Sequence, residues 1–139
     1  KGLGAPIGSI LLGSKLHIAK ALRIRKLLGG AMRQVGFLAA AGIYALDNHL
    51  ERLAEDHKKA KEIGRVLEAV TYVTKVEKIE TNIVIFYVDD KIGDTNFIQK
   101  MAAKKILLTP MGEGKIRIVT HLDYTNEMHE ILLKELKNF

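Results

Sequence analysis

The hydrophobic pattern of this chain changes its period near residue 70, and this change limits the folds open to the chain. Before this point, over residues 50–67, apolar residues recur at helical spacing between charges. After it, TYVTKVEKIE and NIVIFYVDD alternate apolar and polar residues, as half-buried strands do. The remaining pattern predicts a helix near 94–104 with Asp94 or Thr95 as its cap, strands at ILLTP and IRIVTHL, and a final helix capped by Thr125. We therefore predict a β-β-α-β-β-α unit with helices packed on a mostly antiparallel sheet.

The first part of the chain predicts a glycine-rich loop followed by helices. Residues 1–13 predict a loop and then a short buried strand at residues 10–12. Ser14 can cap a helix over about 15–27, and Gly29 and Gly30 interrupt that helix.

A single longer helix is predicted over residues 32–69. Its first half contains VGFLAAAGIYAL, which is apolar on nearly every side. Such a helix is buried all round or lies in an interface between subunits. The same stretch leaves open the interpretation that the chain is an oligomerisation segment with no activity of its own.

The composition narrows the classes of function. The 22 basic and 16 acidic residues give a net charge of +6, which attracts anions such as nucleic acids, phosphates and carboxylates. Aromatic residues make up only 6% of the chain and do not interleave with the basic helix, so stacking on single-stranded nucleic acid is disfavoured. The absence of cysteine removes disulfides and thiol nucleophiles and fits a cytoplasmic protein. No apolar run reaches the roughly 20 residues of a membrane span.

Two sites near the start of the chain carry cations beside glycines. Lys1 precedes Gly-Leu-Gly, and a tight loop there can present its amine to a cofactor for Schiff-base chemistry. Arg33 follows Gly29 and Gly30; if this glycine pair enters a helix, its free amides with Arg33 and the nearby Lys26 would bind an anion. The alternative is a helix–turn–helix corner with surface cations.

Arg117 is the third candidate, because it lies inside the apolar strand KIRIVTH. Strand alternation places Lys115, Arg117 and Val119 on one face. An arginine in this setting pairs with an acid or binds a ligand carboxylate with two N–H donors, unless it points outward from an edge strand.

The histidines and the known catalytic motifs give weaker signals. His17, His49, His57 and His129 fall among charges on predicted helices and are expected at the surface or in caps, whereas His121 is expected to make a structural hydrogen bond near a site. No histidine pair has metal-ligand spacing, and no P-loop, dinucleotide fingerprint or nucleophile elbow is present. We therefore predict no catalytic metal.

Three segments, in this order, resemble those of one family. KGLGAPIGS, RIRKLLGGAMRQVGFLAAAGIYAL and IRIVTHLD are similar to segments of the low-specificity L-threonine aldolases, pyridoxal-phosphate (PLP) enzymes of fold type I. The resemblance implies an α/β fold in which residues 1–66 end a PLP-binding large domain with a long bridging helix. Residues 67–139 would then form a small C-terminal α/β sandwich domain. It also implies that the large domain continues upstream of Lys1 and that these 139 residues are inactive alone.

The resemblance also implies roles for the candidate residues and a reaction. Lys1 would carry PLP, Lys26 and Arg33 would lie near the cofactor phosphate, and Arg117 would bind the substrate α-carboxylate. The enzyme would cleave L-threonine and L-allo-threonine to glycine and acetaldehyde, as a cytoplasmic dimer of dimers active in glycine biosynthesis, without metal, nucleic acid or membrane as partner. A β-eliminating lyase or an aminotransferase on the same scaffold is the first alternative, although RKLLGGAMRQ favours the aldolase. A basic nucleic-acid-binding module is the second alternative.

Overall fold

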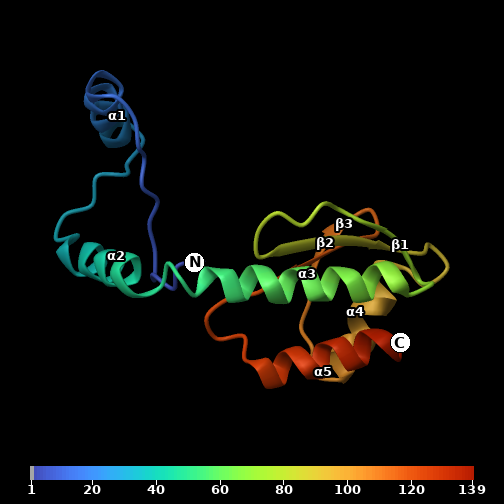
Figure 1. The fold of residues 1–139 in the computed structure, drawn as a ribbon. Helices are drawn as coiled ribbons and strands as arrows, with labels where there is room; N and C mark the ends of the chain where they lie inside the picture. The colour runs from blue at the N-terminus through green and yellow to red at the C-terminus, as the bar shows by residue number, and fades with distance from the viewer. Residues whose placement is uncertain (1) are drawn as a thin grey trace. The chain divides into compact units, whose positions relative to one another are not determined.

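The structure is a computed structural model that describes residues 2–139. The chain divides into two compact units, Leu3–Leu50 and Glu51–Phe139 (Figure 1). Within residues 2–139, no helix combines the length and the apolar character needed to cross a bilayer.

The first unit contains helices α1 (Lys15–Leu27) and α2 (Gly36–Asn48). Helix α1 begins as predicted, because the Ser14 hydroxyl accepts a hydrogen bond from the His17 amide at 3.3 Å. The strand predicted at residues 10–12 is wrong: these residues form no strand and are exposed. A strand needs a neighbour to satisfy its backbone groups, and this short apolar run has none in the described chain.

The helix predicted over residues 32–69 is interrupted in the structure. Helix α2 ends at Asn48, and helix α3 (Leu53–Ala69) begins after a turn at residues 49–52. The Asn48 side chain donates to the Tyr44 carbonyl at 2.8 Å, and the His49 ring bonds the Leu3 carbonyl at 2.6 Å. Both side chains therefore bond to backbone groups at the point where the helix ends. Such bonds compete with the backbone hydrogen bonds of a helix.

The second unit confirms the predicted β-β-α-β-β-α order. Its strands are β1 (Val73–Val76), β2 (Ile83–Val88), β3 (Thr109–Gly112) and β4 (Lys115–Val119), with helix α4 (Asp94–Ala103) after β2 and helix α5 (Asn126–Lys137) after β4. They form an antiparallel sheet of order β1-β2-β4-β3, so β2 and β4 occupy the centre. The Thr125 hydroxyl caps α5 as predicted, whereas the residue that precedes α4 is Gly93 rather than Asp94 or Thr95.

Helices α3, α4 and α5 cover one face of this sheet and enclose the core (Figure 1). Phe97 of α4 is fully buried, and its ring lies 5.8 Å from that of Phe86 on β2 and 4.6 Å from that of Phe139. Gly64 of α3 allows Ile79 to pack against the helix, since a Cβ at this position would overlap the Ile79 Cδ1. Amphipathic helix α3 thus belongs to the second unit. The domain boundary predicted after residue 66 is a separate matter and stays a prediction.

Candidate active site

Arg117 lies on central strand β4, on the face of the sheet opposite the helices. The alternation along β4 is as predicted: Ile116 and Ile118 are buried in the core, and Arg117 is half-buried on the other face. Its neighbours across the ladders are Ile85 on β2 and Thr109 on β3. Because β4 is paired on both sides, the edge-strand alternative for Arg117 is wrong.

The guanidinium of Arg117 has an unsatisfied donor. Its Nε is buried and has no hydrogen-bond partner among residues 2–139. Leaving a buried donor unpaired costs about 1–3 kcal/mol, more for a charged group. Such a donor in a native protein calls for an explanation, and a carboxylate ligand is one that satisfies it.

A charged cluster occupies the same sheet face beside Arg117. The Glu77 carboxylate accepts hydrogen bonds from Lys75 Nζ at 2.7 Å and from the Tyr87 hydroxyl at 3.1 Å. The hydrogen bond from Lys75, followed by that from Tyr87, holds the pKa of Glu77 below its usual value, and Glu77 in turn raises the pKa of Lys75. The ammonium groups of Lys75 and Lys115 lie 5.3 and 5.4 Å from the centre of the Tyr87 ring.

The end of β4 is held by polar contacts from α3 and from the residue that precedes β2. The fully buried Thr120 donates its hydroxyl to the Asp56 carbonyl at 2.8 Å, and its amide donates to the Asn82 carbonyl at 3.0 Å. The Asn82 side chain donates back to the Thr120 carbonyl at 2.7 Å. The Asp56 carboxylate, only 1% exposed, is bound by both terminal nitrogens of Arg52. These contacts fix the strand that carries Arg117.

His129 does not behave as predicted. The sequence predicts it at the surface or in a cap, but it is buried on α5, where Nδ1 bonds the Tyr124 hydroxyl at 3.1 Å and Nε2 bonds Glu62 of α3 at 2.9 Å. The pKa of Tyr124 is raised because burial disfavours its ionised form. The charged residues next to His129 in the sequence suggested an exposed position. His129 lies instead on the face of amphipathic helix α5 that packs against α3. His121 accepts a hydrogen bond from the Asp123 amide at 3.2 Å, which confirms the expected structural bond.

Lys26 and Arg33 lie in the first unit. Lys26 is in the last turn of α1 and Arg33 precedes α2; both are exposed, and within residues 2–139 neither forms an ion pair. The glycine amides between them are not available to an anion. The Gly30 amide donates to the Arg25 carbonyl at 2.8 Å and the Gly29 amide to the Lys26 carbonyl at 3.1 Å.

This pattern is a Schellman motif, with Gly29 in the left-handed region at φ 77°. The predicted anion site on these glycine amides is therefore wrong, because the amides close the C-terminus of α1 instead of opening α2. The helix–turn–helix corner with surface cations describes this segment, and Lys26 and Arg33 themselves stay candidates for binding a phosphate.

The candidate residues fall in different parts of the chain. Lys1 lies outside the described residues, Lys26 and Arg33 belong to the first unit, and Arg117 belongs to the second. The sequence prediction missed Glu77, Lys75 and Tyr87 as neighbours of Arg117. The period-two alternation of TYVTKVEKIE and NIVIFYVDD could have placed these three side chains on one face of the sheet. It could not show that Arg117 lies on the same face, because this depends on the strand order.

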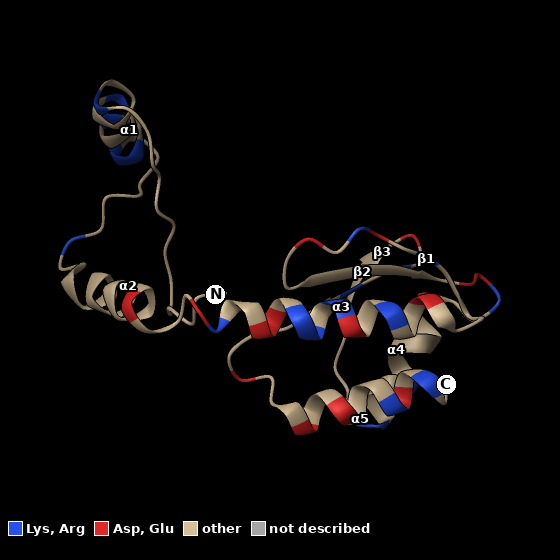
Figure 2. Ribbon diagram, in the orientation of Figure 1, with Lys and Arg blue, Asp and Glu red and all other residues tan. Residues whose placement is uncertain are grey.

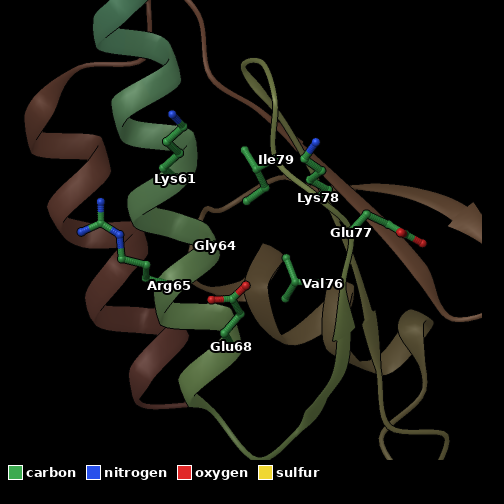
Figure 3. Close-up of a pocket in the computed structure, with 8 residues that line it drawn as sticks. All are labelled: Lys61, Gly64, Arg65, Glu68, Val76, Glu77, Lys78 and Ile79. Atoms are coloured by element: carbon green, nitrogen blue, oxygen red, sulfur yellow. The ribbon is translucent and has the colours of Figure 1, made fainter.

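A separate hollow of about 310 Å³ lies between α3 and the segment after β1 (Figure 3). Its rim carries both signs of charge, including Arg65 and Glu68 of α3 and Lys78, with Ile79 pointing toward Gly64 (Figure 3). This mixed and open lining offers no convergent set of donors, and no donor in it is buried and unpaired among residues 2–139 as the Nε of Arg117 is. Among residues 2–139, no three side chains of His, Cys, Asp or Glu are grouped so as to hold a metal ion.

Comparison with solved structures defines the class of fold. The cystine C–S lyase C-DES, in complex with its reaction product cysteine persulfide, matches 75% of this chain and 28% of its own with a TM-score of 0.58 at 22% identity. A C-DES mutant with glycine covalently linked to its PLP cofactor matches equally well. The predicted α/β fold class, shared with part of a fold-type-I enzyme, is thereby confirmed.

The sequence comparisons then define the family. The family model described as "Beta-eliminating lyase" matches residues 1–91, and the chain belongs to this family. It is 40% identical over 130 residues to the low specificity L-threonine aldolase of Escherichia coli (strain K12), covering 91% of this chain and 37% of the relative. It is also 40% identical over 124 residues to the probable low-specificity L-threonine aldolase 2 of Arabidopsis thaliana, covering 87% and 35%. The chain thus spans about 35–38% of the length of the curated relatives it matches.

Proposed function

We propose that the protein containing this chain cleaves L-threonine and L-allo-threonine to glycine and acetaldehyde with bound PLP. The observation that carries this proposal is the buried, unpartnered Nε of Arg117 on an open sheet face. It is supported by the identity to low-specificity L-threonine aldolases over most of the chain.

The cations of the chain fit the chemical groups of PLP and an amino acid. Within residues 2–139, Lys26, Arg33 and Arg117 have no carboxylate partner, so their charges are free for an external anion. Lys26 and Arg33 would bind the cofactor phosphate, and Lys1 would hold the cofactor through its side-chain amine. When bound, PLP supplies an electron sink for the electron pair left on Cα when the Cα–Cβ bond breaks.

Arg117 has the task of binding the α-carboxylate of the amino acid. Its planar guanidinium can donate two parallel N–H bonds to a carboxylate, which fixes the orientation of the Cα substituents. Orientation matters because the bond that breaks must be held in a reactive geometry.

Replacing Arg117 in the intact natural protein tests this role. We expect R117K to lower kcat/KM for L-threonine by about 100-fold, because an ammonium cannot make the bidentate contact and one lost charged hydrogen bond of 1.5–3 kcal/mol accounts for about this factor. Acetaldehyde and glycine are measured together. If kcat/KM of R117K equals that of the wild type, the proposed role of Arg117 is contradicted.

Borohydride reduction with peptide mapping tests Lys1 independently. A pyridoxyl adduct on Lys1 is expected, and an adduct on another lysine would contradict the assignment.

A second candidate is β-elimination, since the family description and the fold shared with C-DES favour it. Product analysis separates the two reactions. Cleavage of threonine gives glycine and acetaldehyde. Elimination gives pyruvate and ammonia, and the sulfur leaves as cysteine persulfide from cystine or as hydrogen sulfide from cysteine. Formation of pyruvate without acetaldehyde would replace the aldolase proposal with the lyase.

The proposal extends to the setting of the enzyme. We infer a cytoplasmic homo-oligomer, a dimer of dimers, that contributes to glycine biosynthesis. The many exposed apolar residues of α1 and α2 support an interface in the first unit. Light scattering of the intact protein measures the oligomeric state.

A further inference from the structure

Glu77 and Arg117 lie in one row across the sheet, separated by a single residue. The Glu77 amide donates to the Ile85 carbonyl at 2.8 Å, and Ile85 is the register partner of Arg117. Neighbouring strands lie about 4.8 Å apart, so the two backbones are separated by roughly 10 Å. Extended glutamate and arginine side chains can span this distance over Ile85. An internal acid is thus within reach of Arg117, whose Nε has no hydrogen-bond partner among residues 2–139.

Two residues hold the Glu77 carboxylate elsewhere. Lys75 and Tyr87 both donate to its Oε1, at 2.7 and 3.1 Å. Lys75 and Lys115 flank the Tyr87 ring, which keeps this ring next to Glu77. The hydrogen bond from Lys75 lowers the pKa of Glu77, so the carboxylate is ionised at neutral pH and would be a strong competitor if released.

We propose that Lys75 and Tyr87 are positioning residues that hold the Glu77 carboxylate away from Arg117, so that the guanidinium stays free for the substrate α-carboxylate. This inference rests on the proposed role of Arg117. The Glu77 carboxylate and the α-carboxylate of an amino acid are the same chemical group and would compete for the same donors. An internal competitor reduces the fraction of binding-competent protein and therefore weakens apparent affinity.

The kinetic test uses the intact natural protein loaded with PLP. In K75M/Y87F, we expect KM for L-threonine to rise about two- to fivefold with kcat unchanged. The rise is small because an exposed ion pair stabilises only weakly, and the effect is confined to binding. Adding E77Q to this variant removes the competing charge and is expected to restore the wild-type KM. A merely structural effect of losing Lys75 and Tyr87 would not be reversed by E77Q.

A matched control is available on the adjacent segment. Lys78 forms an exposed ion pair with Glu80 at 2.5 Å, so K78M removes one lysine and one ion pair near the same sheet edge. We expect KM in K78M to stay at the wild-type value. A rise in K78M equal to that in K75M/Y87F would attribute the effect to net charge and overturn the proposal.

A crystal structure of the K75M/Y87F protein gives a readout that does not depend on activity. The Glu77 carboxylate is expected within hydrogen-bond distance of the Arg117 guanidinium. A carboxylate that stays away from Arg117, or a raised KM that E77Q does not restore, would overturn the proposal. A wild-type protein that does not cleave threonine would refute the proposed function, while the position of Glu77 in the variant would still decide this inference.

Discussion

The two units of this chain use their apolar residues in opposite ways. In the second unit, Phe86, Phe97 and Leu67 are fully buried between the helices and the sheet. In the first unit, Phe37 is 89% exposed, and α1 contains no buried residue. The second unit has amphipathic helices that need only one sheet to cover them, whereas α2 is apolar on nearly every side and would need cover all round. Hydrophobic content therefore does not by itself predict which part of a chain encloses its own core.

The largest expected effect is a difference in unfolding between the two units when each is studied alone. We expect residues 51–139 alone to unfold cooperatively with urea, because their core is complete within the unit. Residues 3–50 alone should show no cooperative transition, since isolated helices of this length are marginal in water. Circular dichroism during urea titration measures both. A sharp transition in residues 3–50 would contradict the comparison.

A matched pair of phenylalanines tests the same difference at single residues. In the 139-residue chain, F97A should lower the free energy of unfolding of the second unit by about 3–5 kcal/mol, because it leaves a cavity in the core. F37A should change it by less than about 0.5 kcal/mol, since this side chain is exposed in α2. Urea denaturation measures both, and equal effects would refute the assignment of the core to one unit.

Two helical glycines sharpen the comparison further. G64A should destabilise the second unit by about 1 kcal/mol, because the overlap with the end of Ile79 exceeds the gain in helix propensity. A Cβ added at Gly42 would meet no atom of the described residues within 4 Å. G42A should therefore increase the helix content of α2, because alanine is favoured over glycine inside a helix by about 0.5–1 kcal/mol. Denaturation measures the first and circular dichroism the second. Stabilisation by G64A would mean that Ile79 moves away freely.

The smallest expected effect is alkaline and confined to the second unit. Burial raises the pKa of Tyr72 to about 12, and its hydroxyl donates to the Leu136 carbonyl. Tyrosine in the unfolded chain ionises near pH 10, so between about pH 10 and 12 the unfolded chain holds fewer protons than the folded chain. The contribution of Tyr72 to stability is therefore complete below pH 10 and is lost as the pH rises toward 12. Because Tyr72 is half-exposed, we expect a loss below about 1 kcal/mol. Urea unfolding at several pH values measures it, and Y72F should reduce the slope.

The sequence predicted the parts of the fold that depend on local pattern. The β-β-α-β-β-α order, the caps at Ser14 and Thr125 and the alternation around Arg117 were all readable from spacing. The break at residues 49–52 was not, because side-chain bonds such as that from His49 to Leu3 join residues far apart in sequence. The buried position of His129 likewise depends on Glu62 of another helix.

The candidate site was only partly predictable for the same reason. Arg117 was found from its strand, but its neighbours depend on the order β1-β2-β4-β3, which local pattern does not encode. The glycine pair after α1 was assigned to the wrong helix end, because Gly29 and Gly30 fit both a helix start and a helix C-cap by composition.

The central position of β4 has a consequence for the dynamics of the candidate site. Both edges of this strand are hydrogen-bonded, to β2 and to β3, and Thr120 anchors its end. Local fraying at the sheet edges would release β1 or β3 but leave Arg117 in place. Amide hydrogen exchange along β4 should therefore follow global unfolding of the second unit, and the guanidinium remains presented for as long as the unit is folded.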